Sequence, residues 1–235
     1  MTVGEQLFHK ISQDIIEGIL KPLQKLSEPE LAKKYGTSRA PLREAISRLA
    51  ERGMIVIKPR QGPSVAEFSM EKFIEIFEIR EALESHACRL AAERMTNNEL
   101  AQIRRIVLCH EKLIKASNKE EYTHQYKDID FHFLIAKGSG NTFLQKLLCE
   151  DYYDLLLVHR NYHKWVKSRG SQALKDHFNI LMALEERDGE LAEMLMRRHI
   201  KYARISIKKT YQEFIQNGGN KRAHLSNKSK RHLQT

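Results

Sequence analysis

Four side chains that are good ligands for divalent metals are spread over the second half of the chain: Asp128, His132, His177 and His199. Asp128 and His132 are four residues apart, so on a helix they project from the same face. One carboxylate and three imidazoles form a ligand set suited to Zn²⁺, Ni²⁺ or Mn²⁺. All four could converge inside a bundle of helices, and the residue types therefore suggest a metal site.

The spacing alone leaves this metal site open. His159 and His163 are also four residues apart and form an equally regular pair. A buried histidine is more often a hydrogen-bonded core residue than a metal ligand, and pairs with this spacing also arise by chance. From the residues alone, a metal site and a set of core histidines both remain open.

A second group of polar side chains lies near the N-terminus. Arg39, Arg43 and Ser47 are spaced by four residues and form a stripe beside an apolar stripe of leucine and isoleucine. Arginine binds guanine O6 and N7 or phosphate, and Ser38 is placed to contact a phosphate where the helix begins. Two arginines on a helix are, taken singly, more typical of a solvated face.

The elements around this stripe favour DNA binding. Apolar periodicity predicts helices at about residues 5–19, 27–35 and 38–52, the second opened by a capping box of Ser27 and Glu30. Alternating segments at 55–58 and 64–67 predict a β-hairpin. Three short helices and a hairpin form the winged helix-turn-helix plan, whose third helix enters the DNA major groove.

The rest of the chain predicts six further helices and no strand. Gly-Ser-Gly at 138–140 is expected to end a helix, because no strand precedes it as a phosphate loop would require. The expected helices cover about residues 69–95, 96–116, 119–137, 141–164, 168–187 and 189–214. The sequence therefore predicts a mainly α protein with a winged helix-turn-helix at 1–68, an all-α six-helix bundle at 69–215 and a tail at 216–235.

Composition and charge narrow the class of protein. The 235 residues are 41% hydrophobic and 30% charged, with a formal net charge of +10. The tail carries 5 lysines and arginines and no acidic residue, so we expect it to be disordered. Three widely spaced cysteines, no signal peptide and no long apolar run predict a cytoplasmic protein with no membrane partner.

The N-terminal segment resembles a known DNA-binding family. Residues 26–65, LSEPELAKKYGTSRAPLREAISRLAERGMIVIKPRQGPSV, resemble the GntR-type winged helix, whose hallmark Ser-Arg-x-Pro-x-Arg-Glu-Ala runs here from Ser38 to Ala45. The resemblance implies DNA contacts from Ser38, Arg39, Ala40, Arg43 and the wing residue Gly62. Pro29 and Ala40 depart from commoner family residues, arginine and threonine, which leaves the operator sequence open.

The C-terminal segment is similar to the FCD ligand-binding domain of the FadR-type branch. The similar stretches are residues 77–95, 128–141 and 177–200. In the metal-binding subset of that domain, Asp-x-x-x-His lies on one helix and one histidine on each of the last two helices. Asp128, His132, His177 and His199 match these positions. The resemblance therefore implies that these four bind a metal, with Zn expected and Ni or Mn as alternatives.

The resemblance also implies an effector. Four protein ligands on an octahedral ion leave two positions, where a small organic carboxylate is expected to bind through its oxygens. Arg80 and Arg160 are candidates for pairing a second carboxylate through two parallel hydrogen bonds. Arg80 has an alternative, because three acidic residues lie close in sequence and could satisfy it: Glu78, Glu81 and Glu84.

The expected function is therefore a transcriptional regulator, with repression released by a metabolite as the expected polarity. A homodimer would present two recognition helices to a pseudo-palindromic operator in double-stranded DNA. The alternative from another class is a metal-dependent enzyme, since a metal with open positions could activate water. No HExxH helix and no nucleophile motif accompanies the predicted ligands, so an enzyme is not expected.

Overall fold

The computed structural model describes the backbone of residues 1–116, 127–162 and 170–217, and the side chains of 1–115, 131–159 and 170–217. These residues form two compact units. Of the described residues, the first unit contains 1–70, 154–162 and 212–217, and the second contains 71–116, 127–153 and 170–211. We describe each unit by itself.

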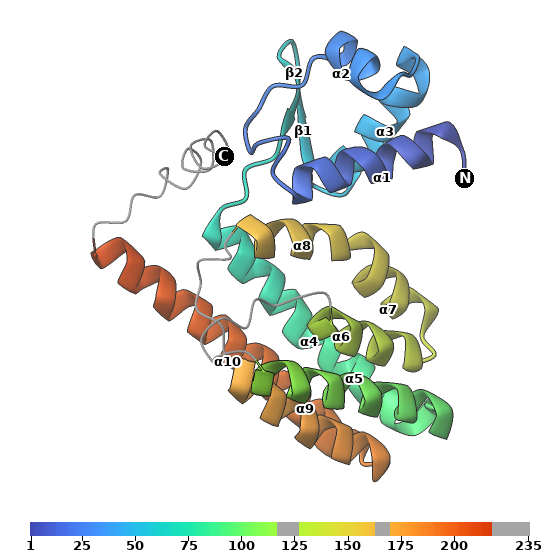
Figure 1. The fold of residues 1–235 in the computed structure, drawn as a ribbon, viewed down its shortest axis with the longest axis vertical. Helices are drawn as coiled ribbons and strands as arrows, with labels where there is room; N and C mark the ends of the chain where they lie inside the picture. Colours follow the sequence, from blue (N-terminus) through green and yellow to red (C-terminus); the bar gives the residue numbers. More distant parts are fainter. Residues whose placement is uncertain (117–126, 163–169, 218–235) are drawn as a thin grey trace. The chain divides into compact units, whose positions relative to one another are not determined.

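The first unit has the expected winged helix-turn-helix. Its elements follow in the order α1 (Val3–Ile16), α2 (Glu28–Tyr35), α3 (Arg39–Glu51), β1 (Ile55–Lys58) and β2 (Gly62–Val65) (Figure 1). Helices α1 and α2 both pack against α3, which also contacts β1. The apolar stripes of the three helices therefore meet in one core, and its most deeply buried side chains include Ile11, Leu42, Ala45, Leu49, Met54 and Val65.

The predicted hairpin is present, but its second strand begins earlier than predicted. The register pairs Ile55 with Val65 and Lys58 with Gly62, so β2 covers 62–65 rather than 64–67. Pro63 lies before the predicted strand, yet in the structure it lies opposite Ile57 in a sheet of two strands. An edge strand tolerates proline because one side of it needs no ladder hydrogen bond.

The ends of α2 differ in how well the sequence predicted them. Ser27 is the N-cap, but its side chain makes no capping hydrogen bond, so the expected capping box is absent. Pro29 has no N–H, which removes one of the two amides that a capping serine normally binds. At the other end Gly36 adopts φ +62°, the left-handed conformation that closes helices, as its position predicted.

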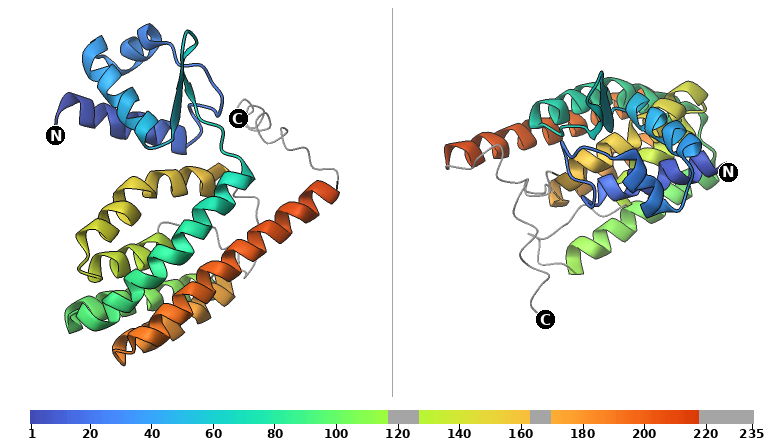
Figure 2. Two further views of the ribbon diagram at one scale, coloured as in Figure 1. Left: turned by 180° about the vertical axis from the view of Figure 1, so that it is seen from behind. Right: turned by 90° about the horizontal axis from the view of Figure 1, so that it is seen from above.

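The second unit is helical throughout its described part (Figure 2). Helix α5 packs against both α6 and α9. Arg204 of α10 contacts Glu81 of α4, and Glu193 of α10 contacts Arg89 of α4, so these two long helices lie side by side and antiparallel. The bounds are α4 (Met70–Arg94), α5 (Asn97–Ala116), α6 (Lys127–Gly138), α7 (Thr142–Lys146), α9 (Gly170–Glu185) and α10 (Gly189–Gln216).

Polar side chains cap three helices of the second unit. Thr96 and Glu99 exchange hydrogen bonds before α5 as a capping box. The side chain of Asp188 accepts from the Leu191 amide at the start of α10. Asn141 likewise accepts from two amides at the start of α7. Local polar side chains therefore decide where these helices begin.

The helix expected at 141–164 is divided. A π-helical turn, η1 (Leu147–Asp151), follows α7 and precedes α8 (Tyr153–Tyr162). The residues of α8 group with the first unit, where Val158 is buried in the winged-helix core and Ser12 donates to Asp154 over 3.1 Å. Helix α8, which is distant in sequence from residues 1–70, thus contributes to the N-terminal core.

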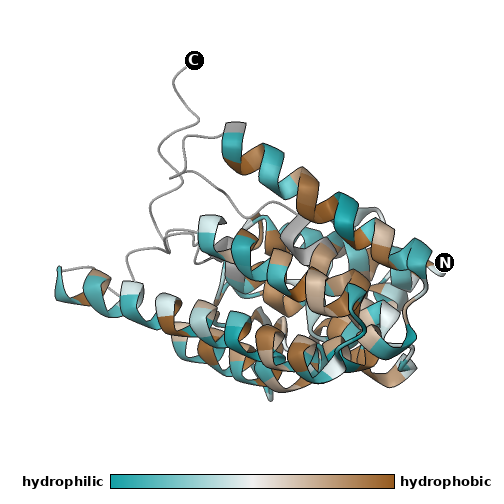
Figure 3. Ribbon diagram, turned by 90° about the horizontal axis from the view of Figure 1, so that it is seen from below, coloured by the Kyte–Doolittle hydropathy of each residue, from teal (hydrophilic) through white to brown (hydrophobic). Residues whose placement is uncertain are grey.

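Every described helix contains both polar and apolar residues. Figure 3 shows hydrophilic and hydrophobic residues recurring along each ribbon, as expected for helices with one buried face. Among the helices that the structure describes, none combines the length and hydropathy needed to cross a membrane.

Candidate metal centre and nucleic-acid interface

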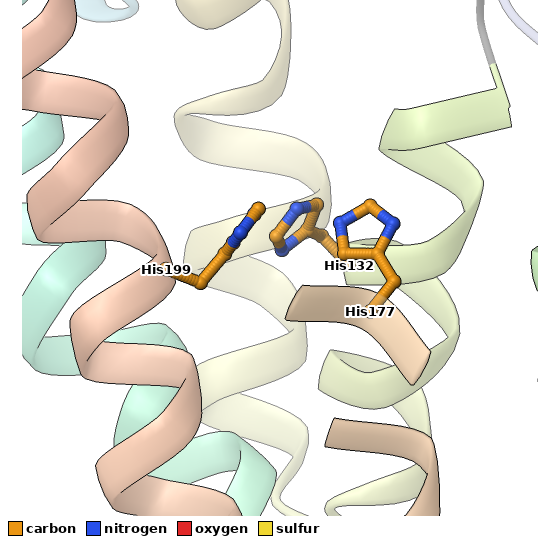
Figure 4. Close-up of side chains that lie close together, drawn as sticks. All are labelled: His132, His177 and His199. Carbon is orange, nitrogen blue, oxygen red and sulfur yellow. The ribbon is translucent and has the colours of Figure 1, made fainter. Parts of the chain in front are cut away.

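Three of the four predicted metal ligands converge inside the second unit. His132 lies on α6, His177 on α9 and His199 on α10, and their rings point toward one another (Figure 4). One nitrogen from each ring lies within 4.8 Å of the others. All three residues are buried, with 9%, 1% and 5% of their surface exposed.

Two of these imidazoles have a carboxylate oxygen close to their Nδ1 atom. His132 Nδ1 is 2.7 Å from Glu84 Oε2, although the ring is not aligned for an ideal hydrogen bond. His199 Nδ1 is 3.1 Å from Asp176 Oδ2. A carboxylate accepts the ring N–H, so the opposite nitrogen, Nε2, keeps its lone pair for a metal.

Glu84 is itself held by Arg80. The guanidinium Nε is 2.5 Å from Glu84 Oε1, and both side chains are less than one-tenth exposed. Burial by itself would raise the pKa of Glu84, but the charges of Arg80 and His132, with their hydrogen bonds, lower it to about 2. Glu84 is therefore an ionised acceptor at neutral pH.

The ring of His177 lies close to two other rings, those of Phe131 and His110. The ring of Phe131, which is fully buried, stacks on it with centroids 4.0 Å apart and planes 20° apart. His110, on α5, lies 6.0 Å away between ring centroids and is also buried. Contacts with Phe131 and His110 limit how the His177 ring can turn.

The donor set fits a divalent metal. Three imidazole nitrogens come from three helices, and carboxylates hold the far side of two rings, as in many metal sites built on histidine. Imidazole suits Zn²⁺, Ni²⁺ and related ions. The chain does not carry the HExxH helix of a metalloprotease beside these residues.

Several predicted site residues lie outside the described side chains. Asp128 belongs to α6, one helical turn before His132, but its side chain is outside the described residues. The same holds for the side chain of Arg160 and for His163. The described site therefore contains three of the four predicted ligands.

Among the described residues His159 does not join the histidine cluster, although its spacing from His163 is as regular as that of the predicted ligands. It belongs to the first unit, is 1% exposed, and meets Phe68 edge-on with ring centroids 5.3 Å apart. Its place on the inner face of α8, beside the buried Val158, explains the difference.

The predicted DNA-contacting residues lie on the outer surface of the winged helix. Arg43 donates to Glu28 of α2 over 2.8 Å, and about two-thirds of its side chain is exposed. Arg48 on the same helix instead lies over the ring of Phe8, 4.9 Å from its centroid. The six predicted contacts are all exposed: Ser38, Arg39, Ala40, Arg43, Ser47 and Gly62.

Sequence reasoning missed the carboxylates behind the histidines. It treated Glu84 only as a partner for Arg80 and gave Asp176 no role. Asp176 holds His199, which is 23 residues away in sequence, and no local spacing predicts that contact. The i,i+4 spacing of Arg80 and Glu84 does predict their ion pair, which the structure contains.

Comparison with known proteins decides the family. Residues 3–65 match the family described as "Bacterial regulatory proteins, gntR family", and residues 75–202 match the FCD domain. The chain belongs to the GntR family. It is a GntR-type transcriptional regulator with an FCD domain, the family that the sequence resemblance predicted.

Full-length relatives agree with this family. The chain is 28% identical over 215 residues to the HTH-type transcriptional repressor RspR of Escherichia coli K12, covering 90% of this chain and 91% of RspR. It is 29% identical over 233 residues to the Glc operon transcriptional activator of the same strain, covering 87% and 89%. These GntR relatives are regulators and not enzymes, so the enzyme alternative is not supported.

Two solved structures show the same fold. E. coli McbR/YncC matches with a TM-score of 0.66 and 24% sequence identity, over 91% of this chain and 99% of that one. A GntR regulator from Rhodococcus sp. RHA1 matches with a TM-score of 0.63 and 18% identity, over 88% and 97%. The winged helix and helical FCD architecture is therefore that of a known fold.

Proposed function

We propose that this GntR regulator binds a pseudo-palindromic DNA operator as a homodimer and is switched by a small organic carboxylate bound at a metal site in its FCD domain. The cluster of His132, His177 and His199 carries the proposal, because three buried imidazoles with carboxylates behind two of them are a costly arrangement for a core without a metal. The DNA-binding domain is assigned to residues 1–68, the FCD domain to 69–215 and a basic tail to 216–235.

DNA binding is assigned to the exposed side of α3 and to the wing. Arg39 and Arg43 contact bases or phosphates, and Ser38 binds a phosphate where α3 begins. Ala40, Ser47 and Gly62 complete the contact surface. All these residues are exposed, while the opposite side of α3 is buried, which supports the assignment.

The metal is assigned as zinc, with nickel or manganese as alternatives. Asp128 is the fourth ligand, since it precedes His132 by one turn of α6. When bound, the metal supplies open coordination positions to the oxygens of a carboxylate effector. Arg80 and Arg160 are assigned to a second carboxylate of the effector, with Arg80 sharing its guanidinium between that group and Glu84.

The protein is assigned as a repressor of transcription, and the effector relieves the repression. It is assigned to the cytoplasm. RspR, which is named a repressor, supports this assignment, while the Glc operon regulator is named an activator. Effector binding acts only through a difference in affinity between two arrangements of the dimer. DNA binding measured with and without effector distinguishes the two polarities.

A pair of single substitutions tests the proposed function. H177A should abolish metal binding and the carboxylate response but leave binding to duplex DNA, selected from a random pool, unchanged. R43A should weaken DNA binding and leave metal binding and the carboxylate response unchanged. The measurements are metal content after dialysis, thermal unfolding against a panel of metabolic carboxylates, and DNA binding by fluorescence anisotropy. If H177A responds to carboxylates as the unaltered protein does, the assigned effector site is wrong.

A further inference from the structure

We infer that Glu84 and Asp176 are positioning residues of the metal site, which set the orientation of His132 and His199 and thereby the affinity for the metal. The inference rests on the metal site proposed above. It adds two residues that are not ligands themselves.

The contacts place one carboxylate behind each of two ligand rings. Glu84 Oε2 is 2.7 Å from Nδ1 of His132, and Asp176 Oδ2 is 3.1 Å from Nδ1 of His199. A carboxylate at Nδ1 keeps the proton there, which leaves Nε2 as the nitrogen that binds a metal. It also makes Nε2 more electron-rich and restrains rotation of the ring.

Each contact joins two helices. Glu84 links α4 to α6, which carries His132, and Asp176 links α9 to α10, which carries His199. The positions of the two rings therefore depend on four helices rather than on the two that carry them. His177 is held differently, by the stacked ring of Phe131.

Both carboxylates are oriented by further donors. Arg80 donates from Nε to Glu84 Oε1 over 2.5 Å and from Nη2 to Oε2 over 3.4 Å, and Oε2 also faces His132. Arg80 in turn lies over the ring of Phe77, 4.8 Å from its centroid. Gln172 donates to Asp176 Oδ1 over 3.0 Å, which leaves Oδ2 for His199. Each carboxylate is thus held by a donor on its own helix and presents one oxygen to a histidine ring.

A purely structural explanation would have Glu84 present only to neutralise the buried Arg80. That explanation predicts a loss of stability without a change in the metal environment. It also does not account for the second carboxylate, Asp176, which contacts His199 in the way that Glu84 contacts His132. Two carboxylates in equivalent positions are better explained by a shared action on the histidines.

The test compares metal binding by the full-length chain and its E84Q and D176N variants. Co²⁺ and Zn²⁺ are the probes, with Co²⁺ followed by its visible absorption and Zn²⁺ by competition with a chelator. We expect each variant to bind the metal about 10–100-fold more weakly and to show a shifted Co²⁺ absorption band. A role in stability alone would not shift that band.

E81Q is the matched control. Glu81 lies on α4, three residues before Glu84, and pairs with Arg204 over 3.1 Å rather than with a histidine. E81Q should keep the metal affinity and the Co²⁺ spectrum of the unaltered chain. If E84Q does not fold, D176N decides the question, since Asp176 lies on a different helix, α9, and contacts the other histidine, His199.

The outcomes separate the two proposals. An unaltered chain that binds neither Co²⁺ nor Zn²⁺ would overturn the proposed metal site itself. An unaltered chain that binds both, with E84Q and D176N binding equally tightly and with the same spectrum, would leave the metal site standing and overturn this inference. Weaker binding and a shifted band in the variants, but not in E81Q, support it.

Discussion

Arg43 and Arg48 lie on the same helix but have different surroundings. Arg43 is largely exposed and paired with Glu28, while Arg48 covers the ring of Phe8. We expect R43A to weaken binding to duplex DNA and to lower the slope of log affinity against log salt by about 1, because one phosphate or base contact is lost. Fluorescence anisotropy at several salt concentrations measures both quantities.

R48M is the control for this prediction. It removes a positive charge from α3 and keeps an apolar side chain near Phe8. Its DNA affinity and salt slope should stay close to those of the unaltered chain. An equal loss in R43A and R48M would show that net charge, rather than the outer face of α3, governs binding.

The three cysteines should differ in reactivity. Cys88 and Cys149 are buried, and burial raises the pKa of both thiols, that of Cys149 to about 12. Few thiolates form on either residue at pH 8, and the thiolate is the reactive form. Cys109 is partly exposed. Iodoacetamide followed by peptide mass spectrometry should label Cys109 first, and C109S should lose the fast phase of labelling.

At the scale of the element, two helix starts that look alike in sequence differ in the structure. Thr96 and Glu99 form a complete capping box before α5, whereas the side chain of Ser27 makes no capping bond before α2. T96A should lower the free energy of unfolding by about 1 kcal/mol, and S27A by much less. Urea unfolding of each variant measures the difference. Equal losses would contradict the capping geometry.

The capping box also predicts a pH dependence. Hydrogen bonds from the backbone and side chain of Thr96 lower the pKa of Glu99 below its ordinary value of 4.5. The stabilisation is therefore present above that ordinary value and is lost as the pH falls through the lowered pKa. The stability difference between the unaltered chain and E99Q should shrink in acid, as urea unfolding at pH 7 and pH 3 would show.

Helix α8 should stabilise the DNA-binding unit although it lies far along the chain. Val158 is 2% exposed and belongs to the winged-helix core. V158A should lower the free energy of unfolding by about 2 kcal/mol, because buried apolar surface is lost. V56A is the control, since Val56 is 40% exposed on β1. Limited proteolysis should cleave the N-terminal unit faster in V158A; equal rates in the two variants would contradict this packing.

At the scale of the whole molecule, metal removal should couple to effector binding. Three helices of the second unit carry the histidines, so chelation should lower the melting temperature. A carboxylate at about 100 times its Kd should add roughly 2.7 kcal/mol of stability to the metal-loaded protein. The chelated protein should show no such gain. Differential scanning fluorimetry measures both effects, and an equal gain without metal would place the effector elsewhere.

Local pattern predicted much of the fold. The apolar stripes of α1 and α3, the caps at Thr96 and Asp188, and Gly36 at the end of α2 follow from interactions within a few residues. The start of β2 does not follow in this way, because a proline can lie in a strand only where its missing N–H is not needed for the ladder. The π turn at η1 likewise has no signal in helical periodicity.

The sequence by itself determined the family, the residue types of the metal site and which side of α3 faces solvent, since these depend on short spacings and on a resemblance that spans the chain. Only the tertiary structure decided that Glu84 stands behind His132 and Asp176 behind His199, and that His159 and Val158 belong to the N-terminal core. The physical reason is that such contacts join helices through packing, and periodicity reports which face of a helix is buried but not which partner covers it.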